Sequence, residues 1–213
     1  MRPSVVLFAK APVPGRVKTR LLARYSAAES AGLHEAFVRD MLGKLNEVAS
    51  VADLELHTDT LTDAWSDIKV ARSLQPAGDL GQRMLHALRA GLSAHRPRVM
   101  IVGSDAPTLP NGHLLALLRA DADVALGPAE DGGYYAISCR RTHPAMFAGV
   151  EWSGQNVLDQ TIRACQACGL SVAAGREWFD IDTPADVDRL ACCSDLPPAT
   201  AAWIERHSRD ARK

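Results

Sequence analysis

The chain has 213 residues, of which 47% are hydrophobic and 23% charged, and its formal net charge at pH 7 is −1. These values are typical of a globular domain that buries about 70% of its unfolded surface, and the near-neutral charge gives no reason to expect a nucleic acid as partner. No apolar run approaches the roughly 20 residues that span a bilayer, and the N-terminus lacks a secretory signal pattern. We therefore expect a cytoplasmic protein that binds neither nucleic acid nor membrane.

The chain has five cysteines, an odd number that makes a framework of disulfides unexpected in such a protein. Cys165 and Cys168 form a C-x-x-C pair, but they fall late in a predicted helix. A second pair at the spacing of a zinc ribbon does not accompany them. We therefore do not favour a metal or redox role for these thiols.

The first predicted strand is the apolar run of residues 5–9, which leads into a basic loop, K-A-P-V-P-G-R-V-K-T-R-L, at residues 10–21. A basic loop directly after the first strand of an α/β sheet is well placed to hold a triphosphate. The loop lacks the glycine spacing of a Walker A motif. A solvated loop of surface charges is the alternative. The loop is shaped by Pro12, Pro14 and Gly15, and its cations are Lys10, Arg16, Lys18 and Arg20.

A long helix is predicted over residues 27–49, where apolar residues recur with helical spacing on one face. We expect this helix to pack on the core and assign it no chemistry. Two short strands are predicted next, at residues 54–58 and 70–74.

A glycine-rich turn follows at residues 75–84, Q-P-A-G-D-L-G-Q-R-M, and opens a helix. Gly78 and Gly81 bracket Asp79, and Arg83 lies in the first turn of the helix. Such a turn admits a base or a phosphate close to the backbone. In the alternative, Asp79 is a plain helix cap.

The rest of the chain is organised around the stretch R-V-M-I-V-G-S-D-A-P-T-L-P. Its apolar run, residues 99–102, predicts a strand buried on both faces, and a glycine and two prolines end that strand. Asp105 then lies at the carboxyl end of a central parallel strand, where open α/β sheets bind ligands, and its oxygens suit a Mg²⁺ that carries phosphates. Alternatively, Asp105 merely caps the helix that begins near Asn111.

A strand at residues 124–126 leads into the turn G-P-A-E-D-G-G-Y-Y-A-I-S, and a further strand begins at Tyr134. The turn combines carboxylates, small residues and tyrosines, which suits the binding of a polar acceptor. Asp-Gly is also a strong hairpin signal, so a purely structural turn is the competing interpretation. The candidate acceptor-binding residues are Asp131, Gly132, Gly133 and Tyr134.

A second acidic centre is W-F-D-I-D-T-P-A-D-V-D-R-L, at residues 178–190. Asp180 and Asp182 alternate with apolar residues, so both carboxylates share one face of an extended segment. Thr183 is expected to cap the helix that follows, and Asp186 lies in its first turn. Capping and interaction with the helix dipole are the alternative role for all three acids. We expect residues 1–191 to form one domain, and residues 192–213 to form a C-terminal helix and tail.

Five of these stretches together resemble the nucleotidyltransferase-like branch of the GT-A superfamily. They are K-A-P-V-P-G-R-V-K-T-R-L, G-D-L-G-Q-R-M, G-S-D-A-P-T-L-P, G-P-A-E-D-G-G-Y-Y and D-I-D-T-P-A-D. The chain is most similar to a family of glycosyltransferase-like proteins related to the guanylyltransferase of deazaflavin cofactor biosynthesis. Relatives that activate sugars usually begin with L-A-A-G-G-x-G-x-R-M, whereas this chain has A-P-V-P-G-R, which leaves the donor open.

The resemblance implies a three-layer α/β/α sandwich with a mostly parallel central sheet, and a nucleotide over the carboxyl ends of the first strands. It implies that Asp105 and Asp182 hold Mg²⁺ or Mn²⁺, and that Lys18 and Arg20 act on the phosphates, so Lys18, Arg20 and Asp105 are the candidate catalytic residues. The residues expected to bind the nucleotide are Lys10, Pro14, Gly15, Arg16, Lys18, Gly78, Asp79, Arg83 and Ser104.

The function we expect is metal-dependent nucleotidyl transfer. A phosphate or phosphonate oxygen of a small acceptor attacks the α-phosphorus of a nucleoside triphosphate, and pyrophosphate leaves. The acceptor supplies its own anionic nucleophile, which fits a sequence without a serine or cysteine nucleophile constellation. The alternatives are glycosyl transfer from a nucleotide-sugar and nucleotide binding without catalysis.

Overall fold

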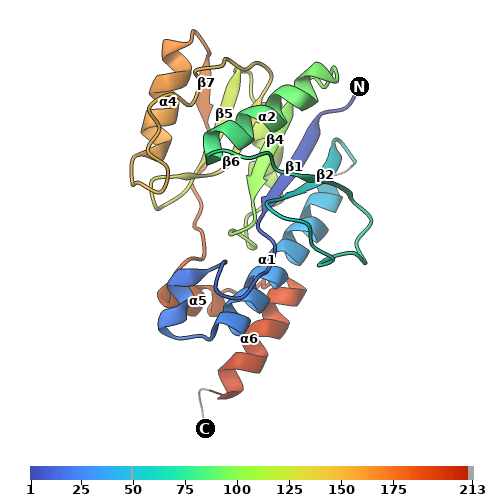
Figure 1. The fold of residues 1–213 in the computed structure, drawn as a ribbon, viewed down its shortest axis with the longest axis vertical. Helices are drawn as coiled ribbons and strands as arrows, with labels where there is room; N and C mark the ends of the chain where they lie inside the picture. The colour runs from blue at the N-terminus through green and yellow to red at the C-terminus, as the bar shows by residue number, and fades with distance from the viewer. Residues whose placement is uncertain (49, 211–213) are drawn as a thin grey trace.

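The computed structural model describes residues 1–48 and 50–210, and in this part of the chain the strands form a single seven-stranded sheet (Figure 1). The strand order is β3-β2-β1-β4-β6-β5-β7, and only β6 runs antiparallel to its neighbours among the described strands. The strands are β1 (Ser4–Ala9), β2 (Asp53–Thr58), β3 (Ala71–Leu74), β4 (Val99–Gly103), β5 (Val124–Pro128), β6 (Tyr134–Cys139) and β7 (Val172–Ala174).

Helices cover both faces of this sheet. The helices are η1 (Thr19–Ala23), α1 (Ala27–Val48), α2 (Leu80–Ser93), α3 (Asn111–Arg119), α4 (Val157–Ala167), α5 (Pro184–Ala191) and α6 (Pro198–Asp210). Residues of α1 and α3 pack on one face, and residues of α2 and α4 pack on the other. The predicted fold class, a three-layer α/β/α sandwich with a mostly parallel sheet, is confirmed.

The alternation of side chains along β1 explains how one strand serves both cores. Leu7 packs in the core under α1 and α3, whereas Val6 and Phe8 pack in the core under α2. Every residue of β1 is buried, as expected for a central strand covered on both faces. The predicted helix over residues 27–49 is α1, and position 49 lies outside the described residues.

A third core joins η1, α1, α5 and α6 beside the sheet, where Figure 1 shows α5 and α6 below the strands. Trp203 of α6 donates its indole N–H to the carbonyl oxygen of Glu29 at 3.1 Å. Asp40 of α1 accepts hydrogen bonds from the first amides of α6. The C-terminal segment predicted as helix and tail thus includes a helix packed on α1, and positions 211–213 lie outside the described residues.

Within residues 1–48 and 50–210, none of the helices has both the length and the apolar character that a membrane crossing requires.

Candidate functional site

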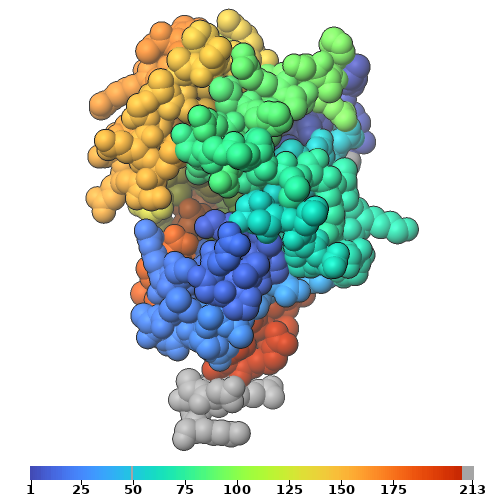
Figure 2. Space-filling view, viewed as in Figure 1, coloured from blue at the N-terminus to red at the C-terminus, as the bar shows by residue number. Residues whose placement is uncertain are grey.

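A cavity of about 370 Å³ lies where β1 and β4 end, between the loop after β1 and the start of α2. This volume falls within the range of small-molecule sites. In Figure 2 the surface is hollowed between the blue N-terminal loop and the green segment above it. The polar lining consists of Lys10, Lys18, Thr19, Arg20, His34, Gln75, Arg83, Ser104, Asp105 and Asp182.

Lys18 holds two carboxylates together at the centre of this lining. Its ammonium nitrogen lies 2.9 Å from Oδ1 of Asp105, 2.9 Å from Oδ1 of Asp182 and 2.6 Å from the carbonyl oxygen of Ile181. An ammonium group has three hydrogens to donate, and these three acceptors match them. The two carboxylate oxygens therefore lie within twice 2.9 Å of each other, so the structure brings the predicted metal ligands Asp105 and Asp182 together.

Local backbone features put these groups in place. The N–H of Ile181 donates to the carbonyl oxygen of Asp105 at 2.9 Å, which fixes the extended segment beside the end of β4. Thr183 and Asp186 form a capping box at the start of α5, directly after Asp182. Lys18 has left-handed backbone angles (φ 47°, ψ 42°), which for a residue with a side chain costs on the order of 1–3 kcal/mol.

Asp105 does not cap α3, because Pro110 occupies the N-cap position of that helix. The capping interpretation of Asp105 is therefore wrong. Asp182 also lies outside the capping box, which is formed by Thr183 and Asp186.

The charges in the site shift one another's proton affinities. Burial acts to lower the pKa of Lys18, but the adjacent carboxylates outweigh it and the pKa is raised. Burial likewise acts to raise the pKa of Asp105, and the Lys18 ammonium outweighs it, so that this carboxyl stays ionised at neutral pH. Burial and the repulsion of Asp105 and Asp131 raise the pKa of Asp180 to about 7.

The exposed side chain of Arg20 also contacts Asp182. Its guanidinium lies 3.4 Å from Oδ2 of Asp182, and its side chain is 63% exposed. The three predicted catalytic residues, Lys18, Arg20 and Asp105, thus line one cavity. Lys10, Arg83 and Ser104 of the predicted nucleotide-binding set line it too.

Three polar lining residues were not singled out in the sequence, namely Thr19, His34 and Gln75. Nε2 of His34, on α1, lies 2.9 Å from the carbonyl oxygen of Lys10, and Nδ1 lies 4.0 Å from Oδ1 of Asp105. A carbonyl only accepts, so Nε2 carries the proton of the neutral ring, which burial favours by lowering the pKa of His34. Gln75 donates its amide to the carbonyl oxygens of Ala9 and His57, which joins the ends of β1 and β2.

His34 could have been found in the sequence, because it falls on the buried stripe of a predicted helix, where a polar side chain needs a partner. Gln75 carries no such signal, since it follows an exposed edge strand.

Five predicted nucleotide-binding residues lie outside the cavity lining. Pro14, Gly15 and Arg16 are exposed on the loop after β1. Asp79 is the N-cap of α2 in a capping box with Gln82, which is its alternative, structural role. Gly78 has a positive φ of 123° and accepts a hydrogen bond from Nε of Arg83 at 2.8 Å.

The predicted acceptor turn also lies outside the lining, and its contacts are those of a hairpin between β5 and β6. Gly132 has a φ of 88°, and a Cβ there would meet the carbonyl oxygen of Gln155 at 1.8 Å, so the turn itself requires glycine. The carboxylate of Asp131 accepts the N–H of Gly133 at 2.9 Å. Tyr134 packs with the core under α2. These contacts support the structural interpretation of the turn.

Comparison with known proteins shows the family to which the chain belongs. Residues 38–154 match the model of a family described as "Uncharacterized protein conserved in bacteria (DUF2064)". The chain belongs to this family. It is also 31% identical, over 195 residues, to a 3-phospho-D-glycerate guanylyltransferase of Phenylobacterium zucineum (strain HLK1), an alignment covering 82% of this chain and 84% of the relative.

Two solved structures show the same fold. A protein of Desulfovibrio desulfuricans G20, assigned as a nucleotide-diphospho-sugar transferase, superposes with a TM-score of 0.85 and 30% identity over 99% of this chain and 96% of that one. A cytidylyltransferase of Leptospira borgpetersenii serovar Hardjo-bovis (strain JB197) superposes with a TM-score of 0.57 over 100% and 96% of the two chains, at 13% identity. With the guanylyltransferase relative, the first of these identifies the chain as a transferase.

Proposed function

We propose that this protein is a Mg²⁺-dependent guanylyltransferase that moves GMP from GTP to a small phosphorylated acid such as 3-phospho-D-glycerate. The donor base and the acceptor are those in the name of the relative, with which the chain shares 31% identity over most of both chains. The expectation from the sequence, nucleotidyl transfer to a phosphorylated acceptor, is of the same class.

One observation carries the proposal, namely that Asp105 and Asp182 both contact the ammonium group of Lys18 in an open cavity. The side chains of these acids are 41% and 37% exposed, so they remain accessible from the cavity although Lys18 contacts both. Cationic side chains of the same lining suit the phosphates of a nucleotide. These are Lys10, Arg20 and Arg83.

The residues present fit a divalent metal ion. Two carboxylates that already share one positive charge form a hard-oxygen pair, and Mg²⁺ usually takes one or two protein carboxylates together with phosphates and water. Asp105 and Asp182 would be its ligands from the chain. When bound, Mg²⁺ supplies a positive charge that stabilises the negative charge of the phosphates.

The reaction needs no nucleophile from the protein. An oxygen of the acceptor phosphate bonds to the α-phosphorus of GTP, the bond from that phosphorus to the bridging oxygen breaks, and pyrophosphate leaves with the electron pair. The attacking oxygen is already anionic, so no side chain has to remove a proton. The chain's contribution is to bind the phosphates with Lys18, Arg20 and Lys10 and to hold the two substrates in line.

Glycosyl transfer from a nucleotide-sugar is a second candidate, favoured by the match to the structure assigned as a nucleotide-diphospho-sugar transferase. The same carboxylates and cations would then hold a diphosphate rather than a triphosphate.

The test is an assay of pyrophosphate release from GTP with Mg²⁺, with and without 3-phospho-D-glycerate, and with ATP, CTP and UTP in parallel. We expect release that requires both GTP and the acceptor. Arg24→Met should release pyrophosphate as the wild type does, because Arg24 pairs with Asp188 outside the cavity lining. Release of a nucleoside diphosphate from a nucleotide-sugar, with no pyrophosphate from any triphosphate, would establish glycosyl transfer instead.

A further inference from the structure

The ammonium of Lys18 occupies the position that a bound divalent cation would need. It touches Oδ1 of Asp105 and Oδ1 of Asp182 at 2.9 Å each, and only 4% of its side chain is exposed. A Mg²⁺ on the same two oxygens would form bonds of about 2.1 Å, so it would lie no more than about 5 Å from the ammonium nitrogen. Two cations at that separation repel each other, so the metal and the ammonium compete for these oxygens.

We propose that Lys18 is an internal placeholder for the metal ion, which bridges Asp105 and Asp182 in the free protein and leaves them when the metal–nucleotide complex binds. The proposal rests on the proposed function, from which it takes the metal and the nucleotide. It adds that the same side chain alternates between two sets of partners, first the carboxylates and then the phosphates.

Two features of the structure make the exchange feasible. Lys18 itself lines the cavity, so phosphates bound there lie within the range of its flexible four-carbon side chain. Two of its three acceptors are side-chain carboxylates, and only Ile181 contributes a backbone oxygen. In the competing account, Lys18 is a permanent structural link that holds the loop after β1 against the sheet whether or not a ligand is bound.

The exchange makes the binding of metal and nucleotide cooperative. Metal alone must displace an ammonium that then has no new partner, so its affinity is low. Nucleotide phosphates give the released ammonium new acceptors, and linkage then requires that each ligand tightens the binding of the other.

The test compares the binding of Mg²⁺ alone to the wild type, to Lys18→Met and to Arg24→Met, by calorimetry without nucleotide. In Lys18→Met the carboxylates lose the competing ammonium, so we expect Mg²⁺ to bind about ten-fold more tightly than to the wild type. We also expect Mg²⁺ to raise the melting temperature of Lys18→Met more than that of the wild type. Arg24→Met removes an equal charge from an exposed pair with Asp188 and should bind Mg²⁺ as the wild type does. Equal or weaker Mg²⁺ binding by Lys18→Met would overturn the proposal and indicate that Lys18 is a permanent structural link.

A second measurement uses the wild-type protein, in case Lys18→Met does not fold. The Nζ resonance of Lys18 is followed by NMR with Mg²⁺ alone, and then with Mg²⁺ and GTP together. We expect a large shift or a loss of the signal only with both ligands, and an unchanged signal at saturation would contradict the exchange. Failure of this proposal is distinct from failure of the proposed function, because pyrophosphate release by the wild type does not depend on either measurement.

Discussion

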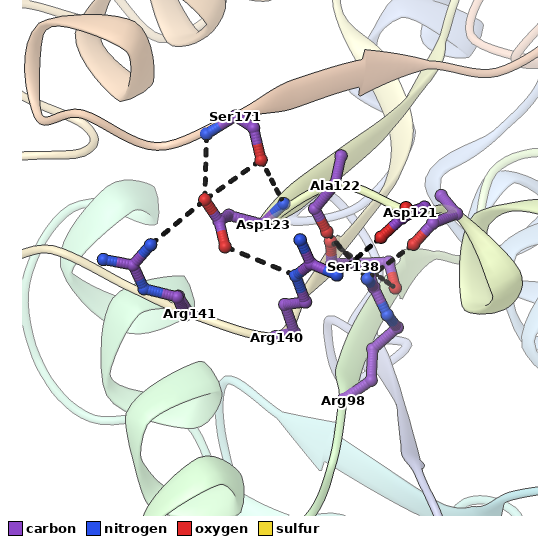
Figure 3. Close-up of polar contacts among 9 residues, drawn as sticks. Arg98, Asp121, Ala122, Asp123, Ser138, Arg140, Arg141 and Ser171 are labelled. Atoms are coloured by element: carbon purple, nitrogen blue, oxygen red, sulfur yellow. Dashed lines mark hydrogen bonds and ion pairs between the residues drawn. The ribbon is translucent and has the colours of Figure 1, made fainter.

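The two ends of β4 hold charged side chains in opposite ways. Arg98 directly precedes the strand, and Asp105 follows it after one further residue. At the amino end, Arg98 is only 6% exposed and donates to the backbone carbonyl of Ala120. It also donates to the backbone carbonyls of Ala122 and Ser138 (Figure 3). At the carboxyl end, Asp105 is held through a lysine side chain and remains accessible from a cavity.

The neighbouring Asp123 completes the network at the amino end. Its carboxylate accepts from the N–H and the hydroxyl of Ser171, both at 3.0 Å, and from Arg140 and Arg141 at 3.3 Å (Figure 3). Charges tied to backbone groups of adjacent segments stabilise one arrangement of the chain. Charges tied to each other by a flexible side chain can change partners for a ligand. The same chemical groups therefore serve stability at one end of the strand and, we propose, binding at the other.

The largest effect is expected from changes at the carboxyl end. Asp105→Asn and Asp182→Asn should each lower kcat/KM for pyrophosphate release about 1,000-fold, because each removes charge that holds the metal and phosphates. Both variants should keep a cooperative melt in circular dichroism. Turnover within a few-fold of the wild type in either variant would contradict the assignment of that carboxylate.

Asp123→Ala is the reciprocal change at the amino end. We expect it to lower the free energy of unfolding by about 1–2 kcal/mol, because the hydrogen bonds that the buried carboxylate accepts from Ser171, Arg140 and Arg141 are lost. Urea denaturation measures this loss. Turnover per folded molecule should stay at the wild-type value. A folded but inactive variant would show that the amino end of β4 also contributes to activity.

The pH dependence of stability sharpens the role of Asp123. The hydrogen bond from the backbone of Ser171 and the adjacent arginines lower the pKa of Asp123 to about 2, below an unfolded value of about 3.9. Its stabilising contribution is therefore present above about pH 4 and is lost as the pH falls towards about 2. In urea titrations across this range, the stability difference between wild type and Asp123→Asn should shrink by about 2 kcal/mol. A difference that stays constant with pH would contradict the assignment.

The smallest effect is expected from Arg20→Ala. The side chain is largely exposed and contacts Asp182 at 3.4 Å, so its loss should change stability by only about 0.5 kcal/mol. If Arg20 binds phosphate, its loss should weaken GTP binding about ten-fold, the equivalent of one hydrogen bond to a charged group. Unchanged GTP affinity would show that Arg20 is a solvated surface charge that does not bind phosphate.

The fold could be predicted from the sequence because the patterns that mark strands and helices are local. The apolar run before Asp105 and the helical period of residues 27–49 mark a buried strand and a packed helix without any tertiary information. The position of Asp105 followed from the general geometry of open α/β sheets. The resemblance to the GT-A family implied that Asp182 would lie beside it.

The contacts within the site could not be predicted in the same way. The bridge from Lys18 depends on a left-handed backbone and on segments far apart in the sequence, which no local pattern encodes. The D-G-G turn carried signals for a hairpin and for an acceptor site. The contact between Gly132 and Gln155, visible only in three dimensions, favours the hairpin.

The most direct test of the account is the affinity for GTP with Mg²⁺ and with EDTA, measured by calorimetry for the wild type, Asp105→Asn and Asp123→Asn. The account predicts that Mg²⁺ tightens GTP binding in the wild type and in Asp123→Asn, and that this dependence disappears in Asp105→Asn. A metal dependence retained in Asp105→Asn, or lost in a folded Asp123→Asn, would contradict the claim that the carboxyl end of β4 is the binding end.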